Sequence, residues 1–397
     1  MGCAAGTTRG VNSFEEHLEQ ELALIADDGL RRELRQVDSA QGARVKVGDR
    51  EVLNFSSNDY LGLAGHATLR DAAKKAVDTY GAGVGAARLI SGSLTVHHEL
   101  EEALATFKGT AAALSFATGY ATAGVIPALM GKGDTVVIDK LAHACLVDAA
   151  RASGARLRVF KHNDLDHLER ILEQSGRRDG QVLVVTESVF SMDGDIAPLL
   201  NLVELKERHG AWLMVDEAHA TGLYGEQRRG MVEEFAVADL VEVQMGTLGK
   251  ALGAAGGYVC GTRKLVDLLV NRARPFMFST APVPAQAAAA RAGVELVQSV
   301  EGEKRRTALW SLVDRLKNGL IGRGWKLPPV RSAILPLIVE DEAVAVELSR
   351  CLLESGVWVP AIRYPTVARG AARLRLTVSA AHAPEDIDQL LEALGDA

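Results

Sequence analysis

Between residues 135 and 260 the sequence alternates short apolar runs with helical stretches, and this alternation constrains the fold more than any other feature. Apolar runs without a polar face are typical of strands that are buried on both sides. When helices separate such strands, the strands form a mostly parallel sheet that is covered by helices, an α/β fold. The predicted strands are 135–139, 156–160, 182–186, 212–215, 241–245 and 257–260.

The regions on either side of this alternation predict an N-terminal arm and a smaller C-terminal domain. Leucine and isoleucine recur at helical spacing over 14–35, and a short strand is expected at 51–55. We therefore expect an arm over 1–52, a large domain over 53–284 and a small α+β domain over 285–397. Further predicted helices are 68–80, 96–107, 285–298, 342–354 and 384–394, and further strands are 333–339, 358–362 and 373–378.

Charge and composition exclude several classes of function. The 44 Lys+Arg against 51 Asp+Glu give a net charge of -7 without a long basic run, so no nucleic-acid partner is expected. The uncharged segment 110–131 consists mostly of small and polar residues, which predicts a buried helix and no membrane span. The cysteines Cys3, Cys145, Cys260 and Cys351 lie far apart, so neither a disulfide framework nor a metal site is expected, and a cytoplasmic protein without a signal peptide fits best.

Three familiar motifs fail when their context is tested. The glycines at 81–85 do not complete G-x-G-x-x-G and follow a helix instead of a strand. The sequence DEAH at 216–219 is typical of helicases, but no phosphate-binding G-x-x-x-x-G-K-[ST] accompanies it. No serine lies in G-x-S-x-G, so a hydrolase elbow is not supported.

Polar side chains of complementary chemistry follow three of the predicted strands. One strand is followed by Asp216 and His219, another by a Gly- and Ala-rich stretch that contains Lys250, and a third by a loop with Ser191. The carboxyl ends of parallel strands form the ligand-binding edge of such a sheet. Burial of Lys250 would lower its pKa and make it a nucleophilic amine. For Asp216 and His219, a simple hydrogen-bonded strand end is the alternative interpretation.

These side chains match the requirements of pyridoxal 5'-phosphate (PLP). A lysine forms a Schiff base with the cofactor, a carboxylate keeps the pyridine nitrogen protonated, and hydroxyl and N–H groups bind the phosphate. Lys250 and Asp216 supply the amine and the carboxylate. The further contacts that we predict are Thr247, Gly119 and Tyr120 for the phosphate and His143 for the face of the ring.

The chain resembles the α-oxoamine synthase family of fold-type-I PLP enzymes over nearly all of its length, from about Leu30 to Leu394. Each motif alone is weak, but together they are specific. They are NFSSNDYLGL at 54–63, RLISG at 88–92, TESVFSMDGD at 186–195, VDEAH at 215–219 and TLGKALG at 247–253. The resemblance implies a fold-type-I PLP transferase with a mostly parallel mixed sheet in its large domain, an α+β C-terminal domain and an N-terminal helical arm.

The resemblance also implies a reaction, the decarboxylative condensation of an amino acid with an acyl thioester. The segments 332–338, 361–367 and 372–376 are similar to the biotin-pathway branch, which joins L-alanine to pimeloyl-CoA or pimeloyl carrier protein. Branches that use glycine or serine share Asp216, His219 and Lys250. An aminotransferase or lyase on the same fold is an alternative from another reaction class, and a cofactor-binding regulator is a non-enzymatic one.

Roles for single residues follow from the same resemblance. Lys250 would bind PLP and remove the α-proton, Asp216 would pair with the pyridine nitrogen, and His219 would hydrogen-bond the phenolic oxygen and act as an acid or base near neutral pH. His143 would stack on the ring. Cofactor contacts are implied for Gly119, Tyr120, Ser191 and Thr247, and substrate contacts for Asn58, His143, Arg363, Thr366 and Arg32, with Arg31 the alternative to Arg32 in the arm.

The family pattern further implies a homodimer with the active site at the subunit interface. Three positions near the expected site depart from that pattern, namely Cys145, Phe278 and Tyr364, where serine, tyrosine and proline are common. These departures bear on the predicted acyl-chain preference more than on the predicted type of reaction.

Overall fold

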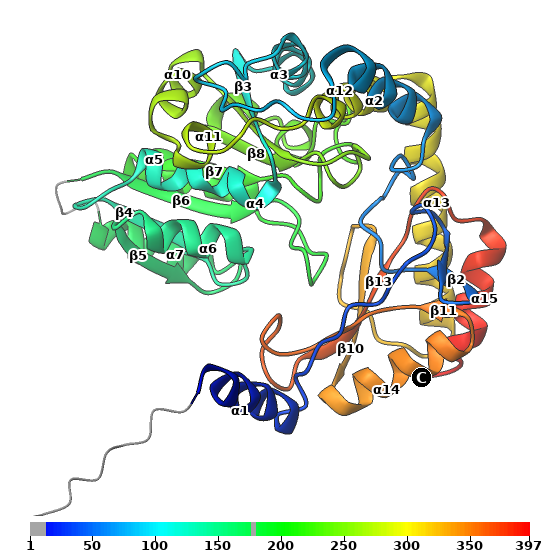
Figure 1. Cartoon of the computed structure of the whole chain (residues 1–397). Helices are drawn as coiled ribbons and strands as arrows, with labels where there is room; N and C mark the ends of the chain where they lie inside the picture. Colours follow the sequence, from blue (N-terminus) through cyan, green and yellow to red (C-terminus); the bar gives the residue numbers. More distant parts are fainter. Residues whose placement is uncertain (1–12, 176–179) are drawn as a thin grey trace, which may run out of the picture.

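A seven-stranded sheet forms the centre of the molecule in our computed structural model, which describes residues 13–175 and 180–397 (Figure 1). The strand order is β3-β9-β8-β7-β6-β4-β5, and β9 is antiparallel to both neighbours while the other pairs are parallel. The α/β prediction with a mostly parallel mixed sheet is thus confirmed. The strands are β3 (Ala112–Phe116), β4 (Thr135–Asp139), β5 (Arg156–Phe160), β6 (Val182–Glu187), β7 (Trp212–Asp216), β8 (Val243–Thr247) and β9 (Gly257–Gly261).

Both faces of this sheet are buried, and successive residues serve opposite faces. Val137 belongs to one buried cluster, whereas its neighbours Val136 and Ile138 belong to another. This is the period of two that a strand imposes on its side chains. The apolar runs in the sequence therefore supply two cores at once, one on each face.

Helices cover the two faces of the sheet. Leucines of α7 and α8 belong to the cluster on one face, and residues of α5, α6 and α10 belong to the other. The helices are α2 (Ala67–Tyr80), α3 (Thr95–Lys108), α4 (Gly119–Thr122), α5 (Ile126–Leu129), α6 (Ala144–Ala152), α7 (Leu165–Ser175), α8 (Leu199–His209), α9 (Met231–Glu234), α10 (Arg263–Arg272), α11 (Arg274–Met277), α12 (Pro284–Gln298) and α13 (Val300–Gly322), with 3-10 turns η1 (Ala123–Val125) and η2 (Ala238–Leu240).

The C-terminal part lies to one side of the large sheet, and the long helix α13 leads into it (Figure 1). Strands β10 (Ile334–Glu340), β13 (Ala372–Thr377) and β12 (Ala361–Ile362) form an antiparallel sheet, flanked by α14 (Glu342–Glu354) and α15 (Pro384–Leu394). A second small sheet joins β1 (Arg44–Val47), β2 (Arg50–Asn54) and β11 (Val357–Trp358). Residues 44–54 span the expected end of the arm at residue 52, and they pair with the C-terminal part through β11. The domain boundaries at 52 and 284 stay a prediction.

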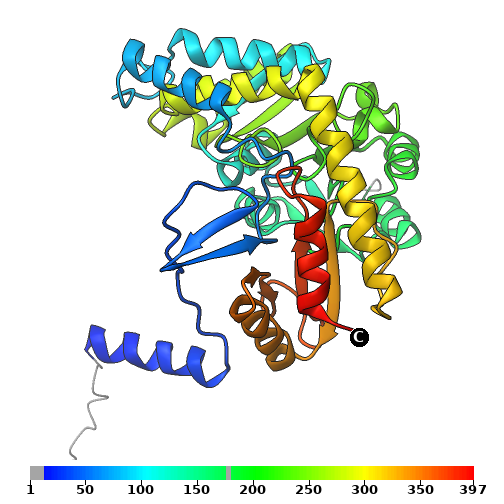
Figure 2. The same ribbon diagram turned by 90° about the vertical axis from the view of Figure 1, so that its right-hand side faces the viewer.

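The N-terminal helix α1 (Phe14–Asp27) stands apart from the rest of the molecule (Figure 2). Ser13 and Glu16 form a capping box at its start, and none of its residues is buried. The N–H groups of Gly29 and Leu30 bond to the carbonyls of Ala26 and Ile25, and Gly29 has a φ of +66°. This is the pattern of a glycine that ends a helix, so the helix predicted to run to residue 35 ends earlier.

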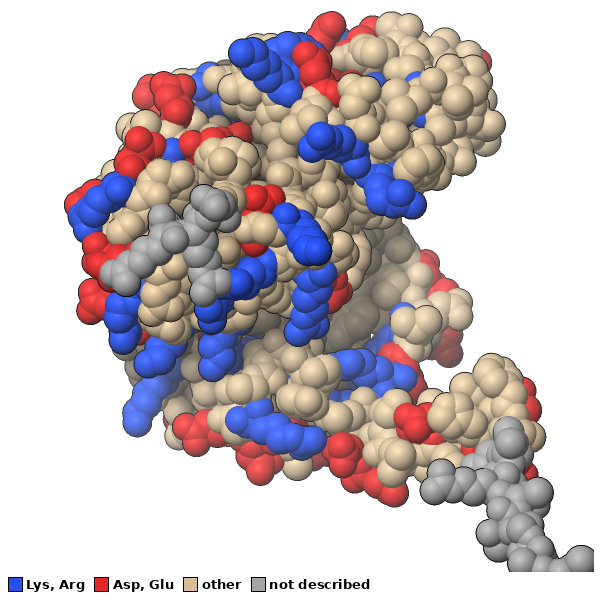
Figure 3. Space-filling view, turned by 90° about the vertical axis from the view of Figure 1, so that its left-hand side faces the viewer, with Lys and Arg blue, Asp and Glu red and all other residues tan. Residues whose placement is uncertain are grey.

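The surface is hollowed between the large domain and the C-terminal part (Figure 3). On the same view lysine and arginine side chains gather over the large domain, where the edge strand β5 carries the exposed Arg156 and Arg158. Charged side chains on an edge strand oppose pairing with another sheet. Within residues 13–175 and 180–397 no helix is long and apolar enough to cross a membrane.

Other differences from the sequence prediction have local causes. Strands β1 and β3 were not predicted; β3 is alanine-rich and lies in the uncharged segment 110–131, which suggested a helix alone. The strand predicted over 358–362 is two short strands, β11 and β12, which belong to different sheets on either side of Pro360. Strand β8 begins two residues later than expected. Residues 1–12 of the expected arm, including Cys3, lie outside the described residues.

Candidate active site

A cavity of about 150 Å³ lies at the carboxyl ends of the central parallel strands. Residues in or just after the ends of β4, β6, β7 and β8 line it, as the parallel topology predicts, together with Gly119 and Tyr120 after β3. The lining residues are Gly119, Tyr120, His143, Cys145, Glu187, Asp216, Ala218, His219, Met245, Gly246, Thr247 and Lys250. The structure therefore brings Lys250, Asp216, His219 and His143 together around one space, although they lie on three different connections of the sheet.

Lys250 and His219 are in direct contact, and Tyr60 extends the contact behind them. Lys250 Nζ lies 2.6 Å from His219 Nε2, and Tyr60 Oη lies 2.5 Å from His219 Nδ1. Burial raises the pKa of Tyr60 to about 12, so its hydroxyl keeps its proton. Burial, with Lys250 and Arg375 nearby, holds the pKa of His219 well below its ordinary value. His219 is thus a neutral imidazole in this chain. The sequence predicts that His219 titrates near neutral pH, and its lowered pKa differs from that prediction.

Burial also makes Lys250 a better nucleophile. It lowers the pKa of the amine to about 8, although the carboxylates of Asp216 and Glu187 oppose the shift. A fraction of the amine is then unprotonated near neutral pH, as covalent binding of an aldehyde requires. Lys250 itself is half-buried, and its lowered pKa agrees in direction with the shift expected from the Gly- and Ala-rich stretch.

Two buried carboxyl groups, Asp216 and Glu187, face the cavity from neighbouring strand ends. Asp216 accepts a hydrogen bond from Ala218 N–H at 2.9 Å. Burial raises the pKa of Asp216, and Lys250 opposes that shift. Burial and the nearby Asp216 raise the pKa of Glu187 to about 8, and its Oε1 atom is buried without a hydrogen-bond partner among the described residues. Such an orphaned acceptor indicates that the cavity is built around a polar ligand.

His143 begins helix α6 and faces the cavity from the turn after β4. Its Nδ1 accepts the N–H of Cys145 at 3.2 Å and lies 3.0 Å from the thiol sulfur of the same residue. The proton of a neutral ring is therefore on Nε2. Burial lowers the pKa of His143 and raises that of Cys145 to about 12, so both groups are uncharged at neutral pH.

The predicted phosphate contacts border the same cavity. Thr247 donates its hydroxyl proton to Gly256 O at 2.9 Å, and Gly249 N–H donates to the Thr247 oxygen at 3.2 Å. A Cβ atom at Gly119 would lie 3.3 Å from Thr247 Oγ1, so a larger residue would narrow this side of the cavity. The exposed Tyr120 hydrogen-bonds Asp148 through its hydroxyl.

Sequence reasoning missed Arg375, which links the predicted residues Asn58 and Ser191. Its guanidinium donates from Nε to Ser191 O at 2.7 Å, from Nη1 to Thr377 Oγ1 at 3.0 Å and from Nη2 to Asn58 Oδ1 at 3.1 Å. It is buried and its charge reaches both His219 and Lys250. The sequence did contain a signal for Arg375, since Arg373 and Arg375 alternate with leucines in a strand. An arginine that is buried in a strand needs hydrogen-bond partners, which indicates a site.

The structure gives Arg363 different surroundings from those expected. It donates to the carbonyl oxygens of Gly29 and, at 3.0 Å, of Arg31, both in the arm. With Asp28, Leu30 and residues of α14 it lines a separate cavity of about 380 Å³, which shares no lining residue with the first. Arg32 is exposed on the segment that follows α1, and the exposed Thr366 donates its N–H to Arg363 O. Arg363 thus contacts the arm in this chain, and the substrate contacts expected of Arg363, Arg32 and Thr366 stay a prediction.

The residues present fit PLP. The cavity offers a primary amine with a lowered pKa, a buried carboxylate, a neutral imidazole with its second nitrogen engaged, and an aromatic ring at its rim. Lys250 would carry the aldehyde carbon, Asp216 the pyridine nitrogen and Thr247 the phosphate. Within the described ranges, no cluster of His, Cys, Asp or Glu is placed to hold a metal ion.

Comparison with known proteins agrees with this site. The family model described as aminotransferase class I and II matches residues 50–394. The chain is 46% identical over 386 residues to the 8-amino-7-oxononanoate synthase of Herminiimonas arsenicoxydans, which covers 96% of this chain and 99% of that protein. It is 48% identical over 375 residues to the 8-amino-7-oxononanoate synthase of Geobacter sulfurreducens, with 94% and 96% covered.

Among solved structures, a serine palmitoyltransferase from S. paucimobilis with PLP bound superposes with a TM-score of 0.91 at 29% identity, over 97% of this chain and 98% of that one. Fold and site together define a fold-type-I PLP enzyme, and the PLP prediction is confirmed. More narrowly, the chain belongs to the aminotransferase class I and II family and, within it, to the α-oxoamine synthases.

Proposed function

We propose that the protein condenses L-alanine with a pimeloyl thioester, of CoA or of a carrier protein, to 8-amino-7-oxononanoate, CO2 and free thiol in biotin biosynthesis. The observation that carries this proposal is the contact between Lys250 and His219 beside the buried carboxyl of Asp216, in a chain whose full-length relatives bear that enzyme's name. The remaining assignments concern how single side chains serve this reaction.

Bound PLP supplies an electron sink that stabilises negative charge at the amino-acid α-carbon. Lys250 serves as the base that removes the α-proton, because burial lowers its pKa to about 8 and so leaves about a tenth of its amine unprotonated at pH 7. Asp216 stabilises a proton on the pyridine nitrogen, since a buried carboxylate beside a buried cation is a strong pairing. Both groups lie in the same water-poor cavity, where such charge interactions are strongest.

His219 holds a proton at a defined atom. Tyr60 donates its hydroxyl proton to Nδ1, so the neutral imidazole carries its own proton on Nε2, the atom that faces Lys250. This N–H can donate to an oxygen of a bound ligand without a change in charge. His219 therefore acts as a fixed hydrogen-bond donor across the neutral range, and its lowered pKa serves that role.

Arg375 is the group that we assign to the carboxylate of the amino acid, with Asn58 beside it. Its hydrogen bonds to Ser191, Thr377 and Asn58 fix the guanidinium, and a further side-chain hydrogen bond joins it to Tyr60, which leaves one of its five N–H groups for a carboxylate. The charge of Arg375 also offsets that of a substrate near His219 and Lys250. Arg363, which binds the arm, is assigned with Arg32 and Thr366 to the acyl substrate or product.

A second copy of the chain would complete the molecule. Leu89 is 47% exposed, Ile90 83% and Phe278 67%, and the apolar side chains of α1 have no covering in one chain. Apolar surface of this kind marks an interaction site. We assign it to a homodimer interface next to the active site, in a protein that works in the cytoplasm, where unpaired thiols such as Cys145, Cys260 and Cys351 persist.

The experiment that tests the reaction is a substrate panel. L-Alanine, glycine and L-serine are each mixed with PLP-loaded protein and with pimeloyl-CoA, pimeloyl carrier protein, acetyl-CoA, succinyl-CoA or palmitoyl-CoA, and thiol release is measured. We expect the highest kcat/KM for L-alanine with a pimeloyl thioester. A preference for another pair would overturn the substrate assignment, and an amino-acid-dependent product without thiol release would indicate an aminotransferase or lyase.

A further inference from the structure

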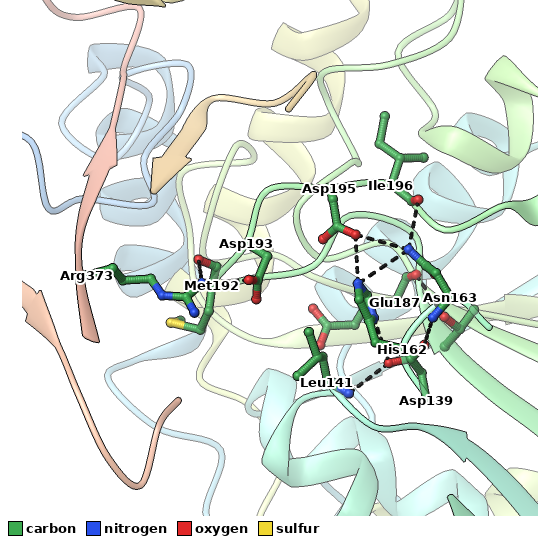
Figure 4. A network of polar contacts seen from close by, with 11 residues as sticks. Asp139, Leu141, His162, Asn163, Glu187, Met192, Asp193, Asp195, Ile196 and Arg373 are labelled. Carbon is green, nitrogen blue, oxygen red and sulfur yellow. Dashed lines mark hydrogen bonds and ion pairs between the residues drawn. The ribbon is translucent and has the colours of Figure 1, made fainter. Parts of the chain in front are cut away.

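Two irregular segments lead away from strands β4 and β6 next to the PLP cavity, which His143 and Glu187 line. One is the turn after β4, which runs from Asp139 to His143. The other is the loop after β6, which carries Ser191 and runs to Asp195. A group of polar side chains lies between these segments (Figure 4). Their separation determines where His143 and Ser191 stand relative to the cofactor.

His162, just beyond β5, bridges the two segments. Its Nδ1 lies 3.0 Å from Asp139 Oδ1 and its Nε2 lies 2.7 Å from Asp195 Oδ2. Both ring nitrogens therefore face carboxylate oxygens, a geometry that only the doubly protonated imidazolium satisfies. The ring also packs edge-on against Phe190, which fixes its plane. His162 consequently connects the β4 turn to the β6 loop through two charge-assisted hydrogen bonds (Figure 4).

Each carboxylate in turn holds its own segment. Asp139 accepts the N–H of Leu141 at 2.8 Å, within the turn that leads to His143, and its other oxygen accepts the N–H of Asn163. Asp195 accepts the side-chain amide of Asn163 at 3.0 Å, while its Oδ1 atom is buried without a hydrogen-bond partner in the described chain. The charge of Asp195 is thus balanced mainly by His162.

The β6 loop is also held from the opposite side, by the C-terminal part. Arg373 of β13 lies 2.6 Å from Asp193 Oδ1 and donates to Met192 O at 3.2 Å. The neighbouring Arg375 donates to Ser191 O. The loop therefore has cations on both sides, with His162 in the large domain and Arg373 and Arg375 on β13. Figure 4 shows Asp193 between His162 and Arg373. Loss of one cation would let the loop move toward the other.

We propose that His162 is a positioning residue, whose imidazolium between Asp139 and Asp195 sets the relative position of the His143 turn and the Ser191 loop and so shapes the PLP site. His162 touches neither substrate nor cofactor in this arrangement, because it does not line the cavity. The proposal rests on the PLP site itself and is independent of which acyl thioester the enzyme uses. Failure of the substrate panel would therefore leave it untouched.

The first experiment compares His162→Gln with His66→Gln, in which another histidine–carboxylate pair, His66–Glu301 at 3.2 Å, is lost away from the cavity. The dissociation constant of PLP is measured on each apoprotein by fluorescence titration, together with its melting temperature. We expect His162→Gln to weaken PLP binding by at least about tenfold, since displaced residues of the two segments lose their contacts, and His66→Gln to leave it within about twofold. A melting temperature that falls with an unchanged dissociation constant would overturn the proposal.

The second experiment tests the charge bridge and still decides the question if His162→Gln folds poorly. Asp195→Asn is made alone and together with His162→Gln, and the PLP dissociation constants form a double-mutant cycle. We expect Asp195→Asn alone to weaken binding and the double variant to bind better than the product of the two single effects predicts, because Asp195 then no longer carries a charge that has lost its cation. Effects that multiply independently would contradict a charged bridge.

Discussion

Two histidines near the PLP site differ in charge because their surroundings differ: His219 lines the cavity, and His162 lies outside its lining, bonded to Asp139 and Asp195. Around His219 stand Lys250, Arg375 and the hydroxyl of Tyr60, and burial with these cations holds its pKa well below the ordinary value of 6.5. Around His162 stand two carboxylates, and these raise its pKa to about 10 although burial opposes the shift. One is a neutral hydrogen-bond donor and the other a permanent cation.

The comparison shows that the charged neighbours of a buried histidine decide whether its imidazole is protonated. Both rings are shielded from solvent to a large degree, and burial alone would make both neutral. The neutral ring lies where a ligand needs a donor of fixed direction. The charged ring lies where two acidic segments must be held together. The predictions below test this contrast, beginning with the largest expected effect.

Removal of the cation beside His219 should have the largest effect. Lys250→Ala eliminates the amine to which we assign PLP attachment and the role of base, so thiol release should fall by at least about a thousandfold. The loss is measured under saturating PLP, and circular dichroism of the variant serves as the control for folding. Retention of more than a tenth of the wild-type rate would contradict the role of Lys250.

Next comes the second cation near His219, Arg375. Arg375→Lys keeps the charge but loses the N–H groups of the guanidinium, and a hydrogen bond to a charged group contributes about 2 kcal/mol. The KM for L-alanine should therefore rise by about thirtyfold. Arg363→Lys is the matched control, with an expected change in that KM below about threefold. A larger rise in the KM for L-alanine in Arg363→Lys than in Arg375→Lys would indicate that Arg363 binds the carboxylate of the amino acid.

The two histidines should affect stability in opposite directions as pH changes. The folded pKa of His162 exceeds 6.5, so its contribution is complete below pH 6.5 and is lost as pH rises through about 10. The folded pKa of His219 is depressed, so burial of the neutral ring costs stability as pH falls below 6.5. Melting curves should show that His162→Gln is destabilised by about 1–2 kcal/mol at pH 6 and less at pH 10.

His219→Gln provides the opposite arm of the same experiment. This variant should lose less stability than wild type between pH 6.5 and pH 5, because no buried imidazole must then be kept neutral. If both variants followed the same pH trend, the contrast between the two histidines would be refuted.

The smallest effect is expected at Cys145, a position where the family resemblance implies serine. Burial raises the pKa of this thiol to about 12, so it is neutral beside His143 and serves as a small polar neighbour. Cys145→Ser should change kcat/KM by less than about threefold, and iodoacetamide should label Cys145 more slowly than the exposed Cys351. Rapid labelling of Cys145 would mean that a cation lowers its pKa.

The sequence alone predicted the residues whose chemistry is local. Apolar runs located the strands because a strand buried on both faces leaves a continuous signal, and strand ends located Lys250, Asp216 and His219. Arg375 and His162 were missed because their partners lie far away in the sequence. Asn58 is separated from Arg375 by 317 residues, and Asp195 from His162 by 33. The resemblance identified the family, but only the three-dimensional arrangement separates Arg375 from Arg363.

Covalent attachment of PLP to Lys250 is the central claim of this account, and peptide mass spectrometry tests it most directly. PLP-loaded wild-type protein is reduced with borohydride, digested, and searched for peptides that carry the cofactor. The predicted result is a single modified peptide with the cofactor on Lys250, absent from Lys250→Ala. Attachment to another lysine, or no attachment to wild type after saturation with PLP, would contradict it.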